Sequence, residues 1–174
     1  MRERFRAIAR VEKTHGRRGE VVTVAVHGLP SLVREGLEVF AVPPALRGPR
    51  RHVVTSCAHN GRSGRLVSLS GVGDLASAEA LVGKTLLARV ADLPEDLALH
   101  DAERLVGREV VDVATGATGA IAEVIRGPAN DVWVVRGPLG EILVPVIDEV
   151  VSSVPGEGPI PLAVPAGLGW EVDA

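Results

Sequence analysis

The sequence predicts an all-β protein with one or two short helices, arranged as two small β-barrels. Short apolar runs rich in Val and Thr recur along the chain, each bounded by turn residues, which is typical of half-buried strands. Hydrophobic residues make up 46% of the chain and aromatics only 2%, so a core built from Val, Leu, Ile and Ala is expected. An acidic stretch around Pro94, without a clean period, separates two series of these runs.

Six strands are expected in the first half of the chain. Their spacing is short and regular, which predicts a small barrel or sandwich. The segment NGRSG joins two of the runs and is a strong hairpin signal. The runs occupy residues 5–11, 21–27, 38–42, 51–59, 64–72 and 85–90.

One short helix is expected at 74–84, DLASAEALVGK, and it is predicted to plug one end of the barrel. Asp74 can cap its start and Gly83 its end. Four apolar residues then share one helical face: Leu75, Ala78, Leu81 and Val82.

The stretch ADLPEDLALHDAER, 91–104, is interpreted as a linker or a frayed helix. The predicted domains are therefore 1–91 and 104–174, with 92–103 as an acidic linker. The second half resumes the strand pattern and predicts a second small β-rich barrel. Its runs occupy residues 105–113, 120–125, 130–137, 141–146, 148–154 and 159–164.

The charge of the chain is strongly asymmetric. Residues 1–90 hold 15 Lys and Arg against 7 Asp and Glu, a formal charge of +8, whereas residues 91–174 hold 4 against 15, or −11. A basic half suits phosphate backbones, and an acidic half suits a basic protein or simply solvation. No run approaches the roughly 20 apolar residues of a membrane helix, and the single Cys57 excludes an internal disulfide. A soluble cytoplasmic protein is expected.

The stretch KTHGRRGEV, 13–21, concentrates charge and glycine. Its spacing is not that of a P-loop or a dinucleotide fingerprint. It is interpreted as a loop between two strands, where glycines permit positive φ and His15, Arg17 and Arg18 face solvent. Catalysis by His15 is disfavoured because nothing local supplies a partner or nucleophile. A contact with RNA or the ribosome is favoured over a charged turn that binds nothing.

A second basic stretch contains no acid. Its surface would contact phosphates in a salt-sensitive way. Phe5 and Phe40 occupy apolar strand positions and are expected in the core, so recognition of shape or protein is favoured over base readout. The basic stretch comprises Arg47, Arg50, Arg51, His52, His59, Arg62 and Arg65.

Two acidic features are interpreted as ordinary structure. Asn130-Asp131 before a strand is typical turn chemistry, which is favoured over a ligand role. The acids near residues 95–103 lack the spacing of a metal site and are expected on a solvated face. No metal and no cofactor is expected.

Several segments, in order, resemble the RimM family of ribosome maturation factors. HGRRGEV (15–21) is similar to its N-terminal signature, and AEALVGKTL (78–86), with Asp74, to the stretch that closes its first barrel. LVGREV (105–110) resembles the opening of its second domain. GPANDVWVV (127–135) followed by EILVPVIDEVV (141–151) resembles its C-terminal pattern.

The resemblance implies an N-terminal barrel like those of translation factors, a C-terminal PRC barrel, and no catalysis. It also implies binding to the free small subunit through small-subunit ribosomal protein nineteen, and assistance in assembling the head. Family members often carry a Tyr-Tyr pair before the LVG-like segment, where this chain has His100 and Asp101. The candidate partner-binding residues are His15, Gly16, Arg17, Arg18, Gly19, His100, Asp101, Asn130 and Asp131.

The expected function is a non-enzymatic, monomeric assembly factor that binds the immature small subunit and assists 16S rRNA processing. Whether it touches ribosomal RNA directly is left open. The alternatives are a PRC-barrel interaction module acting outside ribosome assembly, and an enzyme using His15 or His100.

Overall fold

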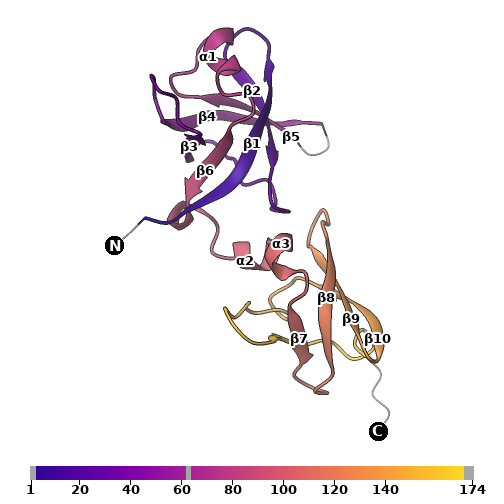
Figure 1. The fold of residues 1–174 in the computed structure, drawn as a ribbon. Helices are drawn as coiled ribbons and strands as arrows, with labels where there is room; N and C mark the ends of the chain where they lie inside the picture. Colours follow the sequence, from indigo (N-terminus) through magenta and orange to yellow (C-terminus); the bar gives the residue numbers. More distant parts are fainter. Residues whose placement is uncertain (1–2, 62–63, 171–174) are drawn as a thin grey trace. The chain divides into compact units, whose positions relative to one another are not determined.

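The computed structural model describes residues 3–61 and 64–170. The chain divides into two compact units, Met1–Pro94 and Glu95–Ala174. Strands dominate both units and the helices are short (Figure 1), so the predicted all-β fold class is confirmed. The predicted domains, 1–91 and 104–174 with 92–103 as an acidic linker, stay a prediction.

Six antiparallel strands form a closed barrel in the first unit. The order around the barrel is β1, β2, β5, β4, β3 and β6, and β6 pairs back onto β1. The strands are β1 (Phe5–His15), β2 (Glu20–Ala25), β3 (Glu38–Val42), β4 (Arg51–Asn60), β5 (Gly64–Leu69) and β6 (Thr85–Arg89). The predicted hairpin between β4 and β5 is confirmed, with Asn60 opposite Gly64.

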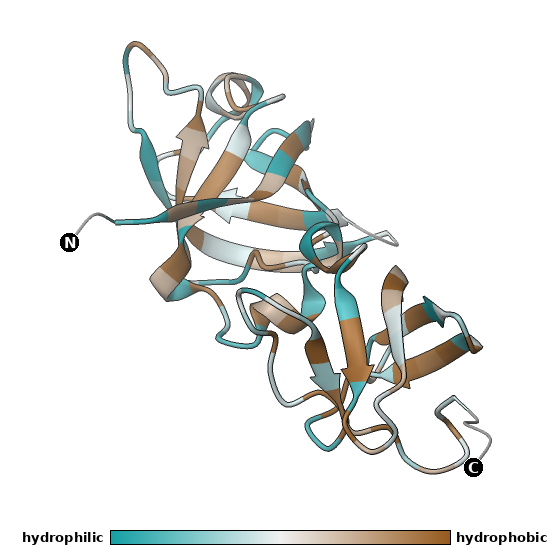
Figure 2. Cartoon of the chain, turned by 60° about the horizontal axis from the view of Figure 1, so that its bottom comes forward, coloured by the Kyte–Doolittle hydropathy of each residue, from teal (hydrophilic) through white to brown (hydrophobic). Residues whose placement is uncertain are grey.

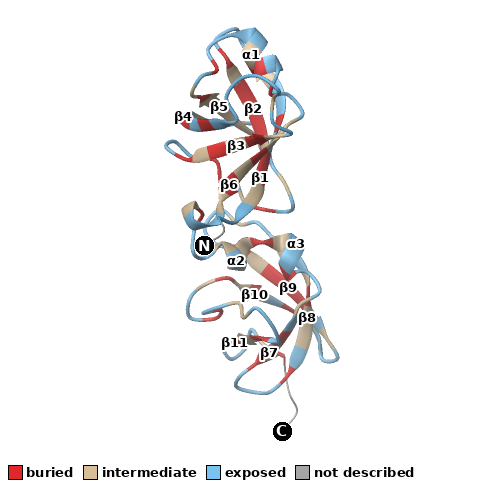
Figure 3. Ribbon diagram, turned by 60° about the vertical axis from the view of Figure 1, so that its left-hand side comes forward, coloured by how far each residue is buried: buried red, intermediate tan, exposed pale blue. Residues whose placement is uncertain are grey.

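The long first strand closes this barrel. β1 shifts register between Val11 and Lys13 where it pairs with β2, and between Ala7 and Ala9 where it pairs with β6. Such irregularities bend a strand and increase its twist, which a small closed sheet requires. Ile8 and Val11 of β1 are fully buried. Figure 3 shows the buried segments lying along the strands and the exposed ones mostly in the loops.

The two phenylalanines lie on the outside of the barrel, so their predicted core position is wrong. Phe5 is 42% exposed, and its ring meets Phe40 edge to face with centroids 5.0 Å apart. The Arg89 guanidinium lies over the Phe40 ring at 5.2 Å. The cause is strand alternation: Val39 and Ala41 are buried and take the interior, which turns Phe40 outward.

The predicted helix at 74–84 is confirmed at its start and is shorter at its end. α1 spans Leu75–Glu79, and Asp74 caps it in a capping box with Ser77. The Ser77 backbone N–H and hydroxyl both donate to the Asp74 carboxylate and hold the pKa of Asp74 below its ordinary value. The helix stops early because Gly83 N–H donates to Val11 of β1, which draws the chain into the barrel wall.

Only half of the predicted helical face is buried. Ala78 and Leu81 are buried, whereas Leu75 is 37% and Val82 42% exposed. The short helix thus rests on the barrel mainly through one alanine and the leucine that follows its last turn.

The second unit is a five-stranded sheet in the order β10, β9, β8, β7, β11. Neighbours are antiparallel except β11, which runs parallel to β7. Its strands are β7 (Glu109–Asp112), β8 (Thr118–Ile125), β9 (Val132–Gly137), β10 (Gly140–Pro145) and β11 (Ile160–Leu162). The 3-10 turn η1 (Val90–Asp92) ends the first unit. The helix α2 (Leu97–His100) lies within the predicted linker, and α3 (Ala102–Leu105) begins in the linker and extends beyond it.

The predicted strand at 148–154 is wrong. This segment begins with a turn, and the N–H groups of Val150 and Val151 both donate to the Ile147 carbonyl. Val150 and Val151 are both buried, so this turn packs into the core of the second unit.

Both tryptophans belong to the core of the second unit. Trp133 is fully buried and donates its indole N–H to the Leu99 carbonyl at 3.3 Å. Trp170 donates to the Gly140 carbonyl at 3.0 Å. Figure 2 shows hydrophobic residues concentrated along the strands of this sheet.

Candidate functional site

The basic turn, defined as residues His15–Gly19, connects β1 to β2. His15 and Glu20 form the last register pair, and the chain reverses over the residues between them. Gly16 and Gly19 have φ angles of 65° and 85°. His15, Arg17 and Arg18 are exposed. The predicted glycine-shaped loop with charged side chains in solvent is therefore confirmed.

The basic turn is anchored by close packing at Gly19. This glycine is buried, and a Cβ built on it would lie 2.4 Å from the Val72 carbonyl oxygen. Val72 precedes the cap of α1 by two residues, so the turn is fixed at the barrel end that carries the helix (Figure 1). The anchored backbone holds Arg17 and Arg18 in place without involving either side chain.

The second basic stretch does not form one continuous cationic surface. Arg47 and Arg50 are exposed, but Arg51 pairs with Glu38 at 2.9 Å. His52 points into the barrel and is 2% exposed. Arg62 lies outside the described residues.

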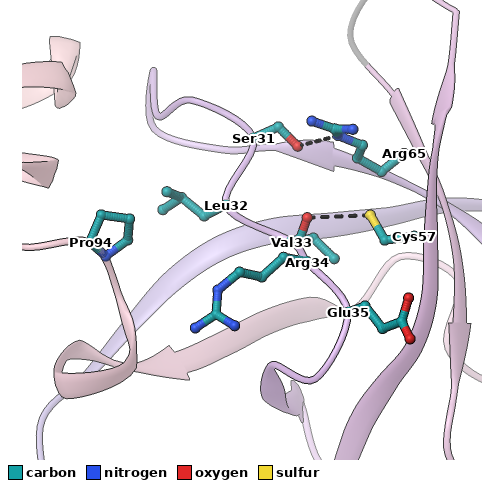
Figure 4. Close-up of a pocket in the computed structure, with 8 residues that line it drawn as sticks. All are labelled: Ser31, Leu32, Val33, Arg34, Glu35, Cys57, Arg65 and Pro94. Carbon is teal, nitrogen blue, oxygen red and sulfur yellow. Dashed lines mark hydrogen bonds between the residues drawn. The ribbon is translucent and has the colours of Figure 1, made fainter.

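A hollow of about 300 Å³ opens on the first unit beside β4 and β5 (Figure 4). Several of its polar side chains are bonded within the fold: Arg65 donates to the Ser31 hydroxyl at 2.9 Å, and Arg34 to the Asp92 carbonyl at 3.2 Å. The Cys57 thiol donates to the Val33 carbonyl at 3.3 Å. Cys57 is half-buried.

In the second unit, the structure brings two of the predicted site residues together. His100 Nδ1 donates to the Asp131 carboxylate at 2.7 Å. Arg126 donates both to that carboxylate and to the His100 carbonyl. These three residues, here called the Asp131 clamp, join α2 to the loop before β9. Asp131 is 7% exposed, so its carboxylate serves as an internal counter-ion.

Asp101 and Asn130, the other two predicted site residues of this unit, do not belong to the Asp131 clamp. Asp101 is 2% exposed and lies at the start of α3, where Arg104 Nε is 3.6 Å from its carboxylate. Asn130 is exposed beside the clamp. Sequence reasoning missed Arg126; its position just before the turn GPAN, five residues from Asp131, was the available signal.

No helix among the described residues has the length and apolar character needed to cross a membrane.

Comparison with known families shows similarity along most of the chain. The model of the RimM PRC barrel domain matches residues 102–167. Three proteins called ribosome maturation factor RimM are similar to the chain. The Streptomyces coelicolor protein is 33% identical over 84% of this chain and 78% of its own length. The Rubrobacter xylanophilus protein is 38% identical over 84% of this chain and 86% of its own length. The Heliobacterium modesticaldum protein is 32% identical over 92% of this chain and 96% of its own length.

Two solved structures also align with the chain. A crystal structure of a 16S ribosomal RNA processing protein RimM from Pseudomonas aeruginosa is 22% identical, covers 94% of this chain and 99% of its own, and gives a TM-score of 0.44. The solution structure of the N-terminal domain of RimM from Thermus thermophilus is 26% identical in sequence. It covers 52% of this chain and 95% of its own, and gives a TM-score of 0.39. On the identity and coverage of its sequence relatives, the chain belongs to the RimM family of ribosome maturation factors.

Proposed function

We propose that this chain is a non-enzymatic, monomeric assembly factor of the cytoplasm. It binds the immature small ribosomal subunit and assists assembly of the head and 16S rRNA processing. A factor that binds one state more tightly shifts the population toward that state by the difference in affinity, without chemistry. The observation that carries the proposal is the anchored basic turn, because it presents Arg17 and Arg18 on a backbone already fixed for docking.

The acidic second unit supports a basic protein as its partner. Because Asp92 falls in the first unit, the two units carry formal charges of +7 and −10. We assign small-subunit ribosomal protein nineteen to the second unit as its partner. Asn130 is exposed for this contact, while the Asp131 clamp fixes the loop that presents it. Electrostatic complementarity of this kind raises the association rate.

His15 and His100, the two histidines considered for an enzyme, lie in environments that suit binding or structural roles. His15 is exposed on the basic turn, and Nδ1 of His100 is engaged by Asp131. The docking role of both regions therefore needs no proton transfer.

Co-sedimentation with ribosomal particles tests the proposal. The wild-type protein is expected to pellet with immature small subunits and to leave mature ribosomes largely unbound. Arg17→Glu combined with Arg18→Glu should weaken that binding and leave Tm unchanged, since both side chains are exposed. Arg4→Glu with Arg10→Glu, also exposed and on the same barrel, is the control of equal charge change and should bind normally.

Equal binding of the wild-type protein to immature and mature subunits would contradict the proposal. A lower Tm in the Arg17 and Arg18 double variant would show that the turn is structural. Capture dominated by proteins outside the ribosome would support an interaction module with another role.

A further inference from the structure

A cavity of about 240 Å³ lies in the first unit next to the anchor of the basic turn. Val72, whose carbonyl meets Gly19, is part of its wall. The loop that contains Arg47 and Pro49 forms another side, and residues around α1 complete it. The cavity and the basic turn therefore share one end of the barrel.

His52 lines this cavity and holds a polar atom without a partner. Its Nδ1 lies 2.8 Å from the Ser70 carbonyl oxygen, and because a carbonyl only accepts, Nδ1 carries the proton. In the neutral ring Nε2 then bears the lone pair. Among the described residues, buried Nε2 finds no hydrogen-bond partner. Because buried polar atoms are nearly always hydrogen-bonded, Nε2 is an acceptor that the hydroxyl of a ligand can satisfy.

The charged residues of the cavity wall are both cationic. Arg47 and Lys84 line it, and neither forms an ion pair within residues 3–61 and 64–170. No Asp or Glu of the described part of the chain belongs to the lining. The Ser77 hydroxyl also lines it but already donates to Asp74 at 2.8 Å. The wall thus offers two cations and one buried acceptor.

We propose that this cavity binds one ribose-phosphate unit. The phosphate meets Arg47 and Lys84, and a ribose hydroxyl donates to His52 Nε2. Pockets for drug-sized ligands hold roughly 300–1,000 Å³, so this smaller space admits sugar and phosphate and leaves the base outside. The loop at 43–50 has no regular secondary structure, and it is the wall that must move to let the hydroxyl reach Nε2.

An RNA strand is the source that the surroundings favour. Val72 lines the cavity and packs against Gly19 of the basic turn, so the exposed Arg17 and Arg18 lie at the same end of the barrel as Arg47 and Lys84. Two groups of cations at one end suit a chain of phosphates rather than a single one. The 2′-hydroxyl is the group that separates RNA from DNA at such a site. This step rests on the proposed function, since it names RNA as a second ligand of a ribosome maturation factor.

Fluorescence anisotropy with two labelled strands tests the site directly. The probes are ten-nucleotide uridine RNA and the matching deoxyuridine DNA, which differ only in the 2′-hydroxyl. The full chain should bind the RNA more tightly by about fivefold, the size of one hydrogen bond. His52→Asn should remove that preference, because an Asn amide can still donate to Ser70 but offers nothing in place of Nε2. Lys84→Gln should weaken both strands equally.

Equal binding of RNA and DNA by the wild-type protein would overturn the proposal, as would an unchanged preference in His52→Asn at unchanged Tm. Should that variant fail to fold, the ¹⁵N resonance of His52 Nε2 in the wild-type protein replaces it. A shift on adding the RNA supports the site, and no shift overturns it. If ribose 5-phosphate displaces the RNA at equal concentration, a free sugar phosphate is the ligand and the RNA assignment is overturned. None of these results alters the co-sedimentation test, which does not involve His52.

Discussion

Gly19 is the residue on which the position of the basic turn depends. Gly19→Ala adds a methyl group 2.4 Å from the Val72 carbonyl at a φ of 85°, so a loss of roughly 3 kcal/mol in the free energy of unfolding is expected. Gly16→Ala is the matched control. It has a similar φ of 65° but its nearest atom is 3.9 Å away, so only about 1 kcal/mol is expected. Urea unfolding measures both, and equal losses would contradict the anchoring role of Val72.

Asp131 is the residue on which the Asp131 clamp of the second unit depends. Asp131→Ala leaves His100 and Arg126 without their shared carboxylate. Because the side chains of His100 and Arg126 are 27% and 35% exposed and can be solvated, a loss of roughly 2 kcal/mol is expected. His100→Asn is the control, because its amide can still donate toward Asp131 and a smaller loss is expected. Trp fluorescence during urea unfolding reports the change, since Trp133 bonds to Leu99 beside His100. An unaltered urea midpoint in Asp131→Ala would show that the Asp131 clamp does not contribute to the stability of this unit.

At the scale of the element, the capping box gives α1 a dependence on pH. The pKa of Asp74 is lowered in the folded protein, so its contribution is complete above the unfolded value of about 3.8 and is lost as pH falls through the lower folded value. Asp74→Ala should lower Tm by roughly 5 °C at pH 7, and this difference should shrink below pH 4. Asp74→Asn retains a capping oxygen but not the negative charge, so its Tm at pH 7 should fall between those of Asp74→Ala and the wild type. A difference that stays constant down to pH 2.5 would contradict the assignment.

Strand periodicity predicted most elements because half-buried strands leave a clear alternation in the sequence. The barrel strands, the β4–β5 hairpin and the basic turn were all found this way. The wrong prediction of a strand at 148–154 has a different cause. The strand expected at 148–154 is a turn whose Val150 and Val151 fill the core, and burial of apolar residues alone does not distinguish these cases.

Contacts between distant segments decided the parts of the site that the sequence could not show. The interior position of His52 depends on Ser70, and the pairing of His100 with Asp131 spans 31 residues. A basic run therefore looked continuous in sequence although the barrel wall turns one of its histidines inward. The identity of a single residue does not indicate such a pairing, because the register of the whole sheet decides which side chains come together.

The two tryptophans provide a test of whether the two units unfold separately. Trp133 and Trp170 both lie in the second unit, and the chain has no other Trp and no Tyr. Gly19→Ala should therefore shift part of the circular dichroism transition to lower urea and leave the fluorescence midpoint unchanged. Asp131→Ala should lower the fluorescence midpoint. A coincident shift of both signals in Gly19→Ala would show that the halves unfold as one.

The order of the strands along the chain has a consequence for synthesis on the ribosome. The barrel is complete once β6 can pair with β1, and every barrel strand among residues 3–61 and 64–170 ends at or before Arg89. The second sheet instead places its last strand, β11, beside its first, β7, so this edge is not filled until residues 160–162 have been translated. The basic unit can therefore finish folding while the acidic one is still emerging from the exit tunnel, and translation itself sets the order in which the two surfaces become available.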